Sequence, residues 1–500
     1  MEAEAARSRS FGHLREHSIG LPETLFQSIT HMAPGAAIAF SILVSVQFAG
    51  PVLPLSVVFA LVACVLVASS IGQLAKQIPS AGGLYAYVTR ALGPHAGFMV
   101  GWAFLLFEPL VAPLLFLIFA WATTDVVKNE WGWDYTGQWW IWIVLAAGIV
   151  FFLTYRDVRL STRAGVVLGV FEITVFAALA IWMIFSNFND NTLQVFNPSH
   201  AEAGTYNGVF KGMVFAILAF IGFEAAAPLG EEARNPRWTV PRAVVLSAFG
   251  IGLFYVLCSY AWVIGTGFPN FTKDTLAQPD PWRHLGEVFW GGAWVLIWLA
   301  ILNSALANSN AGVNAATRVL YSLGRNGALP RAFARTHPQH KTPHVAIIFQ
   351  TILGLTVALL LGWKYSSNLI VAFSILATAV TIVVIAVYIT VCFSCIVYYS
   401  RVERLEQFNP WLHWVFPILG AACFIPPLYY QYFPLPDYPI RYANWIAIGW
   451  LALGVVVTAF VPRQVLRDTE HFFAVEEETG EPEDTALAAP SARPLPAEGS

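Results

Sequence analysis

The chain is 500 residues long, with 57% hydrophobic residues, 11% charged residues and a formal net charge of −3. Soluble domains carry about 25% charged residues, so this composition excludes a solvated globular protein. The small net charge also offers no basic surface for nucleic acid. We therefore expect an all-helical protein that spans a membrane many times and contacts lipid directly.

Apolar blocks close to the ~20 residues that cross a bilayer follow one another along the chain. We predict about twelve transmembrane helices, over 24–47, 52–75, 97–125, 138–155, 163–186, 208–229, 243–266, 291–321, 344–362, 367–399, 412–433 and 442–461. The longest connection, 267–290, lies between the seventh and eighth spans.

These spans divide the chain into five parts. We expect an N-terminal tail (1–23), a first five-helix repeat (24–186), a second five-helix repeat (187–399), two additional helices (400–461) and a disordered acidic tail (462–500). Because five is an odd number, the second repeat enters the membrane from the opposite side and is inverted relative to the first.

The distribution of lysine and arginine predicts the orientation of the helices. With the N-terminus placed in the cytoplasm, the inside segments hold 21 and the outside segments 6 of the 27 lysine and arginine residues. Cytoplasmic segments of membrane proteins are enriched in these residues. We therefore predict that both termini are cytoplasmic and that the number of spans is even.

The first and sixth spans are interrupted at matching places. Pro34 and Gly35 stand inside the first span, and Gly222 and Pro228 stand inside the sixth. Unwound backbone at membrane depth is tolerated where it lines a cavity, and interruptions in two inverted halves point to a transporter binding site. The alternative is a plain proline kink in a structural helix.

Freed backbone groups at these interruptions suit a small zwitterion. Amide N–H groups near the first interruption would bind a carboxylate, and carbonyl groups of the sixth span would bind an ammonium. The residues concerned are Pro34, Gly35, Ala36 and Ala37 in the first span and Phe220 and Ile221 in the sixth, where Gly222 permits close approach.

Three glutamates lie inside predicted spans: Glu108, Glu172 and Glu224. A carboxylate is costly to keep ionised inside a membrane, so such a group is a candidate to take up and release a coupling proton. Glu224, in the sixth-span interruption, is also a candidate to contact the substrate. The alternative for each is a protonated acid that bonds within the bundle, and Glu108 could bond a backbone group freed by Pro109.

Other polar residues in the spans have weaker signals. Asn303 and Asn308, in the run NSALANSNAGVN, could face the same cavity or could hold helices together. His31 precedes the first interruption and could titrate or form a pocket wall. The sequence offers no metal-ligand cluster, and we expect no metal and no cofactor other than a coupling proton, with sodium as the alternative.

Three stretches resemble the amino acid–polyamine–organocation permeases: SAGGLYAYVTRALGPHAGFMVGW (80–102), FIGFEAAAPLGEEARNPRWTVPRA (220–243) and RVLYSLGRNGALPRAFARTHPQHKTP (318–343). The resemblance implies the leucine-transporter-like fold, a five-plus-five inverted repeat followed by two helices. Within it, the stretch Gly35 to Ala37 aligns with a small-residue Gly-x-Gly signature, and the stretch Ile221, Gly222, Phe223 and Glu224 aligns with the broken sixth span. Glu172 aligns with a position where some members carry a lysine in place of a sodium ion.

Together, these features predict a secondary transporter in the plasma membrane that imports an amino acid or a related amine, coupled to protons. An exchanger or a carrier of the polyamine or ethanolamine type is the alternative. We do not expect an enzyme, because no catalytic cluster and no phosphate-binding G-x-x-x-x-G-K-[ST] loop is present.

Overall fold

A computed structural model describes residues 18–461 apart from 134, 135, 157, 203, 269, 279, 326, 328 and 402–405, and it excludes the side chains of 136 and 158–164. The predicted disordered tail and most of the N-terminal tail lie outside the described residues, so nothing in the structure bears on them. Within the described part the chain is helical, with one isolated backbone bridge between Ile19 and Ala233.

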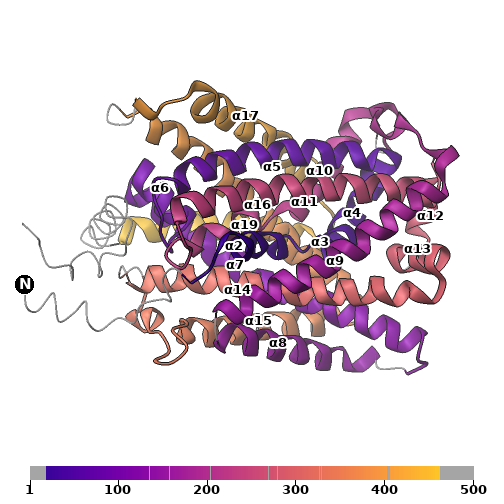
Figure 1. Ribbon diagram of the computed structural model, residues 1–500, viewed down its shortest axis with the longest axis horizontal. Coiled ribbons are helices and arrows are strands. Elements are labelled where there is room, and N and C mark those ends of the chain that lie inside the picture. Colours follow the sequence, from indigo (N-terminus) through magenta and orange to yellow (C-terminus); the bar gives the residue numbers. More distant parts are fainter. Residues whose placement is uncertain are drawn as a thin grey trace, which may run out of the picture.

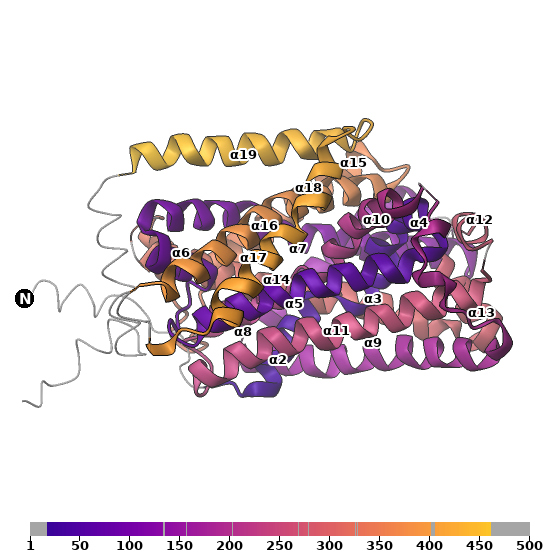
Figure 2. The same cartoon turned by 90° about the horizontal axis from the view of Figure 1, so that it is seen from above.

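The helices run roughly along the long axis of the molecule (Figures 1 and 2). The first half consists of α2 (Leu21–His31), α3 (Pro34–Ala36), the π-helical turn η1 (Ala37–Ser41), α4 (Ile42–Ala49), α5 (Leu53–Ala75), α6 (Leu84–Leu92), α7 (Pro94–Asn129), α8 (Trp139–Arg156) and α9 (Val158–Ser186). The second half consists of α10 (Thr205–Phe220), the 3₁₀ segment η7 (Phe223–Leu229), α11 (Pro236–Thr266), α12 (Phe271–Leu276), α13 (Pro281–Trp290), α14 (Val295–Arg325), α15 (His344–Lys364) and α16 (Leu369–Tyr399). The remaining described helices are η11 (Trp411–Val415), α17 (Phe416–Cys423), α18 (Ile425–Tyr432) and α19 (Arg441–Phe460).

The number of membrane crossings matches the prediction. In the described residues, eleven stretches are long and apolar enough to cross a membrane, and the first of them, Leu21–Ala75, is 55 residues long. This stretch contains two predicted spans, because the chain turns between α4 and α5 at Gly50, which has a φ of +56°. The described chain therefore holds twelve crossings.

Helices at equivalent positions of the two halves pack against each other. Thus α4 contacts α10, α5 contacts α11, α7 contacts α14, and α8 contacts α15. This pairing is the contact pattern of two inverted repeats and confirms the predicted five-plus-five architecture. The helix α19 lies at the edge of the bundle (Figure 2), where it packs against α7 and α16.

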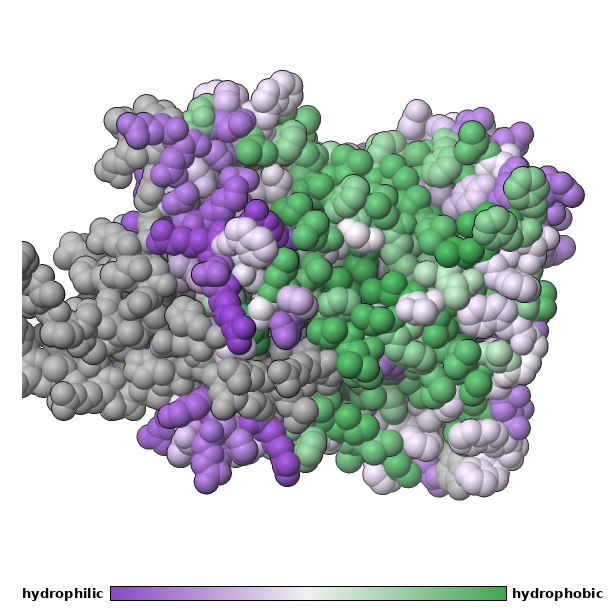
Figure 3. Space-filling model, in the orientation of Figure 1, coloured by the Kyte–Doolittle hydropathy of each residue, from purple (hydrophilic) through white to green (hydrophobic). Residues whose placement is uncertain are grey.

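The surface agrees with a membrane protein. Hydrophobic side chains form a broad band around the middle of the visible face, and hydrophilic side chains gather toward the two ends of the long axis (Figure 3). The larger hydrophilic end includes the start of the described chain, where the amide of Ser18 donates to the carbonyl of Glu232. Near the other described terminus, Thr458 of α19 contacts Met99 at the start of α7.

Both described ends lie on the same face of the membrane domain. The amide of Ala81, in the connection before α6, donates to Glu231, next to the Glu232 that binds Ser18. The start of α7, which contacts α19, follows α6 directly. An even number of crossings requires this arrangement, and the assignment of that face to the cytoplasm stays a prediction.

The connections contain more helix than the apolar blocks indicate. The predicted connection 267–290 holds α12 and α13, and the connection between the second and third spans holds α6. Asp280 caps α13, since its side chain accepts a hydrogen bond from the amide of Arg283 at 3.1 Å, and Pro281 occupies the first helical turn. The side-chain cap and the proline thus mark the start of α13.

Candidate functional site

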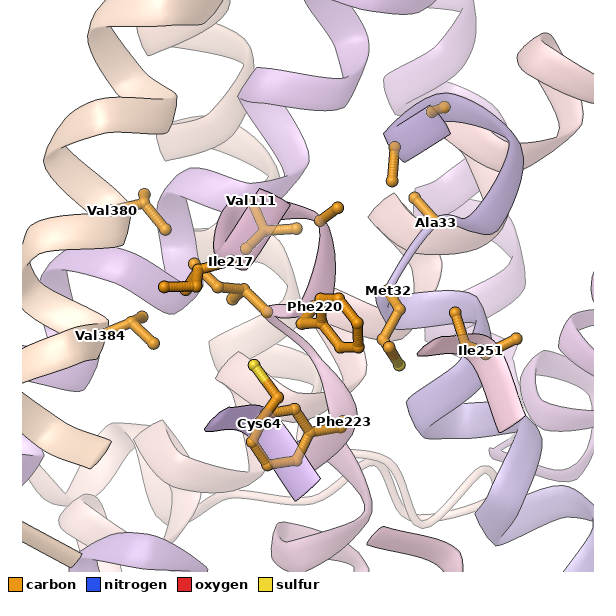
Figure 4. Close-up of a cluster of buried hydrophobic side chains, with 14 of the residues drawn as sticks. Met32, Ala33, Cys64, Val111, Ile217, Phe220, Phe223, Ile251, Val380 and Val384 are labelled. Atoms are coloured by element: carbon orange, nitrogen blue, oxygen red, sulfur yellow. The ribbon is translucent and has the colours of Figure 1, made fainter. Parts of the chain in front are cut away.

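The first predicted span is interrupted at residues 32–33. The helix α2 ends at His31, Ala33 adopts a φ of +48°, and Pro34 begins the short segment α3. Proline has no amide hydrogen and disfavours helical geometry in the residue before it, which explains why the helix ends here. Met32 and Ala33 form the link between the two parts of the span (Figure 4).

The sixth span is interrupted at residues 221–222. The helix α10 ends at Phe220, Ile221 is extended with a ψ of 128°, and Gly222 has a φ of +121°. A Cβ atom at Gly222 would lie 2.6 Å from the carbonyl carbon of His31. Only glycine fits here, for reasons of both conformation and space, and the two interruptions are in direct contact.

Hydrogen bonds also join the two interrupted spans. The hydroxyl of Ser28 in α2 donates to the carbonyl of Phe223 at 2.7 Å and accepts from the amide of Ala226 at 3.1 Å. The hydroxyl of Tyr255 in α11 lies 2.8 Å from the carbonyl oxygen of Met32 and 2.9 Å from that of Ala219. Backbone groups released by the interruptions are thus partly satisfied by side chains of neighbouring helices.

The amides predicted to bind a carboxylate are bonded within the protein. The amide of Gly35 donates to Glu172 Oε2 at 3.1 Å, and that of Ala36 donates to Ser304 Oγ at 2.9 Å. The amide of Ala37 donates to the carbonyl of Ala33 at 2.7 Å, and Pro34 has no amide hydrogen. Glu172 therefore lies against the first interruption, and its side chain is fully buried.

The other two glutamates predicted inside spans lie beside the sixth-span interruption and His31. Glu224 Oε2 accepts hydrogen bonds from the hydroxyl of Tyr388 at 2.6 Å and from the amide of Gly222 at 3.0 Å. Glu108 Oε1 lies 3.4 Å from Nε2 of His31. Four buried side chains that can exchange protons therefore lie together, and each is at most 2% exposed: His31, Glu108, Glu224 and Tyr388.

A cavity of about 50 Å³ lies between the interruptions, large enough for a few water molecules. Its polar lining residues are His31, Ser41 and Asn308, and four predicted site residues line it, namely Ala36, Ala37, Ile221 and Asn308. Much of the wall is apolar. Its side chains come from α7 (Val111, Leu115 and Ile118), α10 (Leu218) and α16 (Phe373 and Val380). Val111 and Val380 approach the interrupted segments from different helices (Figure 4).

The remaining predicted site residues do not line this cavity. Pro34, Gly35, Phe220, Gly222 and Phe223 form the backbone around it, and the three glutamates lie behind its wall. Asn303 instead donates to the carbonyl of Leu168 at 2.7 Å and ties α14 to α9. That contact matches the helix-packing alternative for this residue.

Two buried ion pairs were not singled out by the sequence reasoning. Arg318 Nε of α14 lies 2.8 Å from Glu232 Oε1, and Arg325 Nη2 lies 2.7 Å from Glu231 Oε1. They connect the end of α14 to the segment after η7, on the face that carries Ser18. The adjacent acidic residues in PLGEEA, directly after the interrupted span, are the signal that could have indicated them.

No group of three or more histidine, cysteine, aspartate or glutamate side chains that could hold a metal ion occurs among the described residues. Cys392 and Cys395 are buried, unbridged thiols on α16. The chemistry of the site therefore consists of buried carboxyl, imidazole, phenol and amide groups around a small cavity.

Two interrupted helices in inverted halves, packed around a central cavity, define a membrane transport protein of the leucine-transporter-like fold. The family model for amino acid permeases matches residues 24–465, and the chain belongs to that family.

Known relatives are similar at moderate identity. The low-affinity putrescine importer PlaP of Escherichia coli is 28% identical over 315 residues, which cover 60% of this chain and 66% of the importer. The branched-chain amino acid permease BcaP of Lactococcus lactis is 25% identical over 360 residues, covering 67% of this chain and 74% of the permease. The match to PlaP thus spans somewhat less than two thirds of that relative.

A solved structure with the same fold is that of the Eremococcus coleocola manganese transporter in complex with an aromatic bis-isothiourea substituted compound. It superposes with a TM-score of 0.55 at 12% sequence identity and covers 90% of this chain and 94% of the transporter. At this identity, the likeness establishes the fold alone.

Proposed function

We propose that the protein is a secondary active transporter that imports an amino acid or a related amine across the plasma membrane. The observation that carries this proposal is the direct contact of the two interrupted spans around one cavity, where a Cβ atom on Gly222 would collide with His31. Family membership and the named activities of PlaP and BcaP support the same class of cargo.

Proton coupling is the second part of the proposal. Glu172 contacts the backbone of the first interruption, and Glu224 contacts that of the sixth. A change in the protonation of either carboxyl group changes its hydrogen bonds to the interrupted segments. Binding of a proton is thereby linked to the geometry of the cavity, which is the requirement for coupled transport.

The packing of the helices supports a mechanism of alternating access. The interrupted spans contact α5 and α11, and α7 and α14 pack closely against each other. We propose that one of these groups rocks relative to the other and exposes the cavity to each side in turn. With both termini in the cytoplasm, the ion pairs Arg318–Glu232 and Arg325–Glu231 lie on the inner side and hold it closed.

Uptake into proteoliposomes tests the proposal. Purified full-length protein would be reconstituted and offered labelled amino acids and amines under an inward proton gradient, an inward sodium gradient or no gradient. We expect accumulation of at least one compound with the proton gradient, compared with protein-free liposomes. Accumulation with sodium alone would overturn proton coupling, and the absence of uptake for every compound would overturn the transport function.

A further inference from the structure

The first turns of α11 carry a basic and aromatic surface at one end of the molecule. Arg237, Trp238 and Arg242 are exposed, and the guanidinium carbon of Arg242 lies 4.0 Å from the centre of the Trp238 ring. A surface depression of about 570 Å³ lies beside them and is lined by Asn235, Pro236, Arg237 and Trp238. None of these side chains is acidic, so the depression favours a negatively charged group.

The guanidinium of Arg242 is not neutralised by an acidic neighbour. It donates to the carbonyl of Trp238 at 3.3 Å, and no aspartate or glutamate in the described part of the chain lies within ion-pair distance of it. An arginine side chain has five N–H donors, so most of those of Arg242 remain available. A planar guanidinium group matches the oxygens of a phosphate group, which makes Arg242 a candidate phosphate ligand.

An apolar stripe continues from Arg242 along the same side of α11. Its residues, Leu246, Phe249 and Leu253, are between 48% and 49% exposed, and they follow Arg242 at intervals of four, three and four residues. This spacing places them on one side of a helix. From Arg242 to Leu253 the helix rises ~16 Å, about half of the ~30 Å hydrocarbon core of a bilayer. The stripe therefore has the length of one leaflet.

The basic surface lies at the face of the membrane domain that we predict to be cytoplasmic. The amide of Arg234, just before α11, donates to the carbonyl of Ile19 at 2.8 Å, next to Ser18. Anionic phospholipids are concentrated in the cytoplasmic leaflet and attract lysine and arginine side chains. Tryptophan side chains favour the level of the headgroups, where Trp238 would lie beside Arg242.

From these features we infer that the start of α11 is a binding site for an anionic phospholipid of the surrounding membrane. The phosphate group contacts the guanidinium of Arg242, and the rest of the headgroup occupies the depression beside Trp238. An acyl chain lies along Leu246, Phe249 and Leu253. The inference does not depend on the transport function, because it concerns the outer surface of the bundle rather than the cavity.

Binding of defined lipids to the purified full-length protein tests the inference. The protein in a neutral detergent would be titrated with phosphatidylglycerol, with phosphatidylcholine of the same acyl chains, or with glycerol 3-phosphate. Native mass spectrometry would measure bound lipid, and thermal unfolding would measure stabilisation. We expect phosphatidylglycerol to bind and to raise Tm, phosphatidylcholine to do both more weakly, and glycerol 3-phosphate, which has no acyl chain, to give no shift. Equal binding of the two lipids would overturn the inference.

A matched pair of arginine variants locates the site. Arg242→Gln removes the proposed phosphate ligand at an exposed position, and we expect about fivefold weaker binding of phosphatidylglycerol, with Arg242→Lys retaining most of the affinity. The control is Arg156→Gln at the end of α8. Arg156 is also exposed and lies 4.5 Å from the ring of the residue four positions earlier, Phe152, but it does not line the depression. Equal weakening in both glutamine variants, or unchanged binding in Arg242→Gln, would contradict the assigned site.

The other candidate occupant of the apolar stripe is a second copy of this chain. Native mass spectrometry distinguishes the two, because a protein dimer and a lipid-bound monomer differ in mass. We expect Phe249→Ala to weaken binding of phosphatidylglycerol and to leave the oligomeric state unchanged. A dimer that forms without added lipid and dissociates in Phe249→Ala would assign the stripe to a protein interface and overturn the inference.

Discussion

At the scale of single residues, the site depends on side chains that bond to interrupted backbone. Glu172 accepts from the amide of Gly35, and Glu224 accepts from the amide of Gly222. Each glutamate also has a second oxygen that is buried without a hydrogen-bond partner in the described structure. Protonation of that second oxygen makes the carboxyl group neutral, and a neutral carboxyl group accepts more weakly from the backbone amide than a carboxylate does, so proton exchange changes the bond to the interrupted backbone.

The first prediction separates proton exchange from hydrogen bonding at Glu172. In Glu172→Gln, the amide oxygen still accepts from Gly35, but the side chain can no longer bind or release a proton. We expect accumulation driven by a proton gradient to fall at least tenfold, whereas exchange of labelled for unlabelled substrate without a gradient persists.

The control for this experiment is Glu202→Gln, which changes an exposed glutamate outside the bundle. Gradient-driven uptake should remain at the wild-type level in this control. If Glu172→Gln also retained wild-type accumulation, Glu172 would not be a coupling residue.

At the scale of elements, the two interrupted spans are fitted to each other rather than merely kinked. Ser28 of α2 bonds both Phe223 and Ala226 of η7, and Gly222 touches the backbone of His31. A movement of either interrupted segment must therefore move the other. This contact couples the two inverted halves at the level of the binding cavity.

The second prediction concerns Gly222→Ala. Its φ of +121° is strained for any residue with a Cβ atom, and that atom would collide with His31 at 2.6 Å. We expect destabilisation by about 2 kcal/mol or more and loss of substrate binding, measured by thermal unfolding and thermal shift. The matched control is Gly250→Ala on α11, where a Cβ atom would meet nothing within 4 Å. A Gly222→Ala protein with wild-type stability and binding would show that the interruptions are not tightly fitted.

The third prediction concerns the connection between α11 and α14. Burial raises the pKa of Asp280 to about 6. The hydrogen bond from the amide of Arg283 acts in the opposite direction but is the weaker of the two effects. Because the folded-state pKa lies above the unfolded value of 3.8, ionisation of Asp280 opposes folding as the pH rises through 6. Asp280→Asn, which keeps a capping oxygen, should therefore stabilise the protein on the order of 2 kcal/mol above pH 6.

This stabilisation should diminish as the pH falls from 6 toward 3.8, because the unfolded-state aspartate then begins to bind a proton as well. Thermal unfolding of the wild type and of Asp280→Asn at pH 8 and pH 4.5 measures the difference. If Asp280→Asn stabilised the protein at pH 4.5 as much as at pH 8, or more, the cost assigned to burying the ionised Asp280 carboxylate would be wrong.

At the scale of the whole molecule, two buried ion pairs lie at one face of the membrane domain. Arg318 and Glu232 are at most 1% exposed, and Arg325 pairs with Glu231, which also accepts from the amide of Ala81. These contacts join α14, the segment after η7 and the connection before α6. Both arginine–glutamate pairs lie within the second half, and the bond between Glu231 and the amide of Ala81 links them to the first half.

The fourth prediction concerns the Arg318–Glu232 pair. Arg318→Ala leaves the Glu232 carboxylate buried without its partner, and we expect destabilisation by about 3–5 kcal/mol. The double variant Arg318→Met/Glu232→Leu removes both charges and should recover most of this loss. Thermal unfolding in detergent measures both variants. A double variant as unstable as Arg318→Ala would show that packing of the arginine side chain, not its charge, maintains the contact.

The sequence by itself determined the class and architecture of this protein. Long apolar blocks must become helices in lipid because unpaired backbone groups are too costly there, so the number of spans follows from composition. Pro34 disfavours helical geometry in the residue before it, and Gly222 permits the positive φ found there, so the sequence indicates where the interruptions can form. It does not impose them, because Pro109 and Pro113 lie inside the continuous helix α7. The predicted helices and the two interrupted spans are accordingly confirmed.

Only the tertiary structure decided how the site is built. The sequence indicates buried glutamates, but not that Glu172 reaches the Gly35 amide across 137 positions or that Tyr388 reaches Glu224 across 164. It also could not distinguish Asn308, which lines the cavity, from Asn303, which bonds α9. Helix formation is determined by neighbours in the chain, whereas the partner of a buried polar group is determined by which helices pack together and at what rotation.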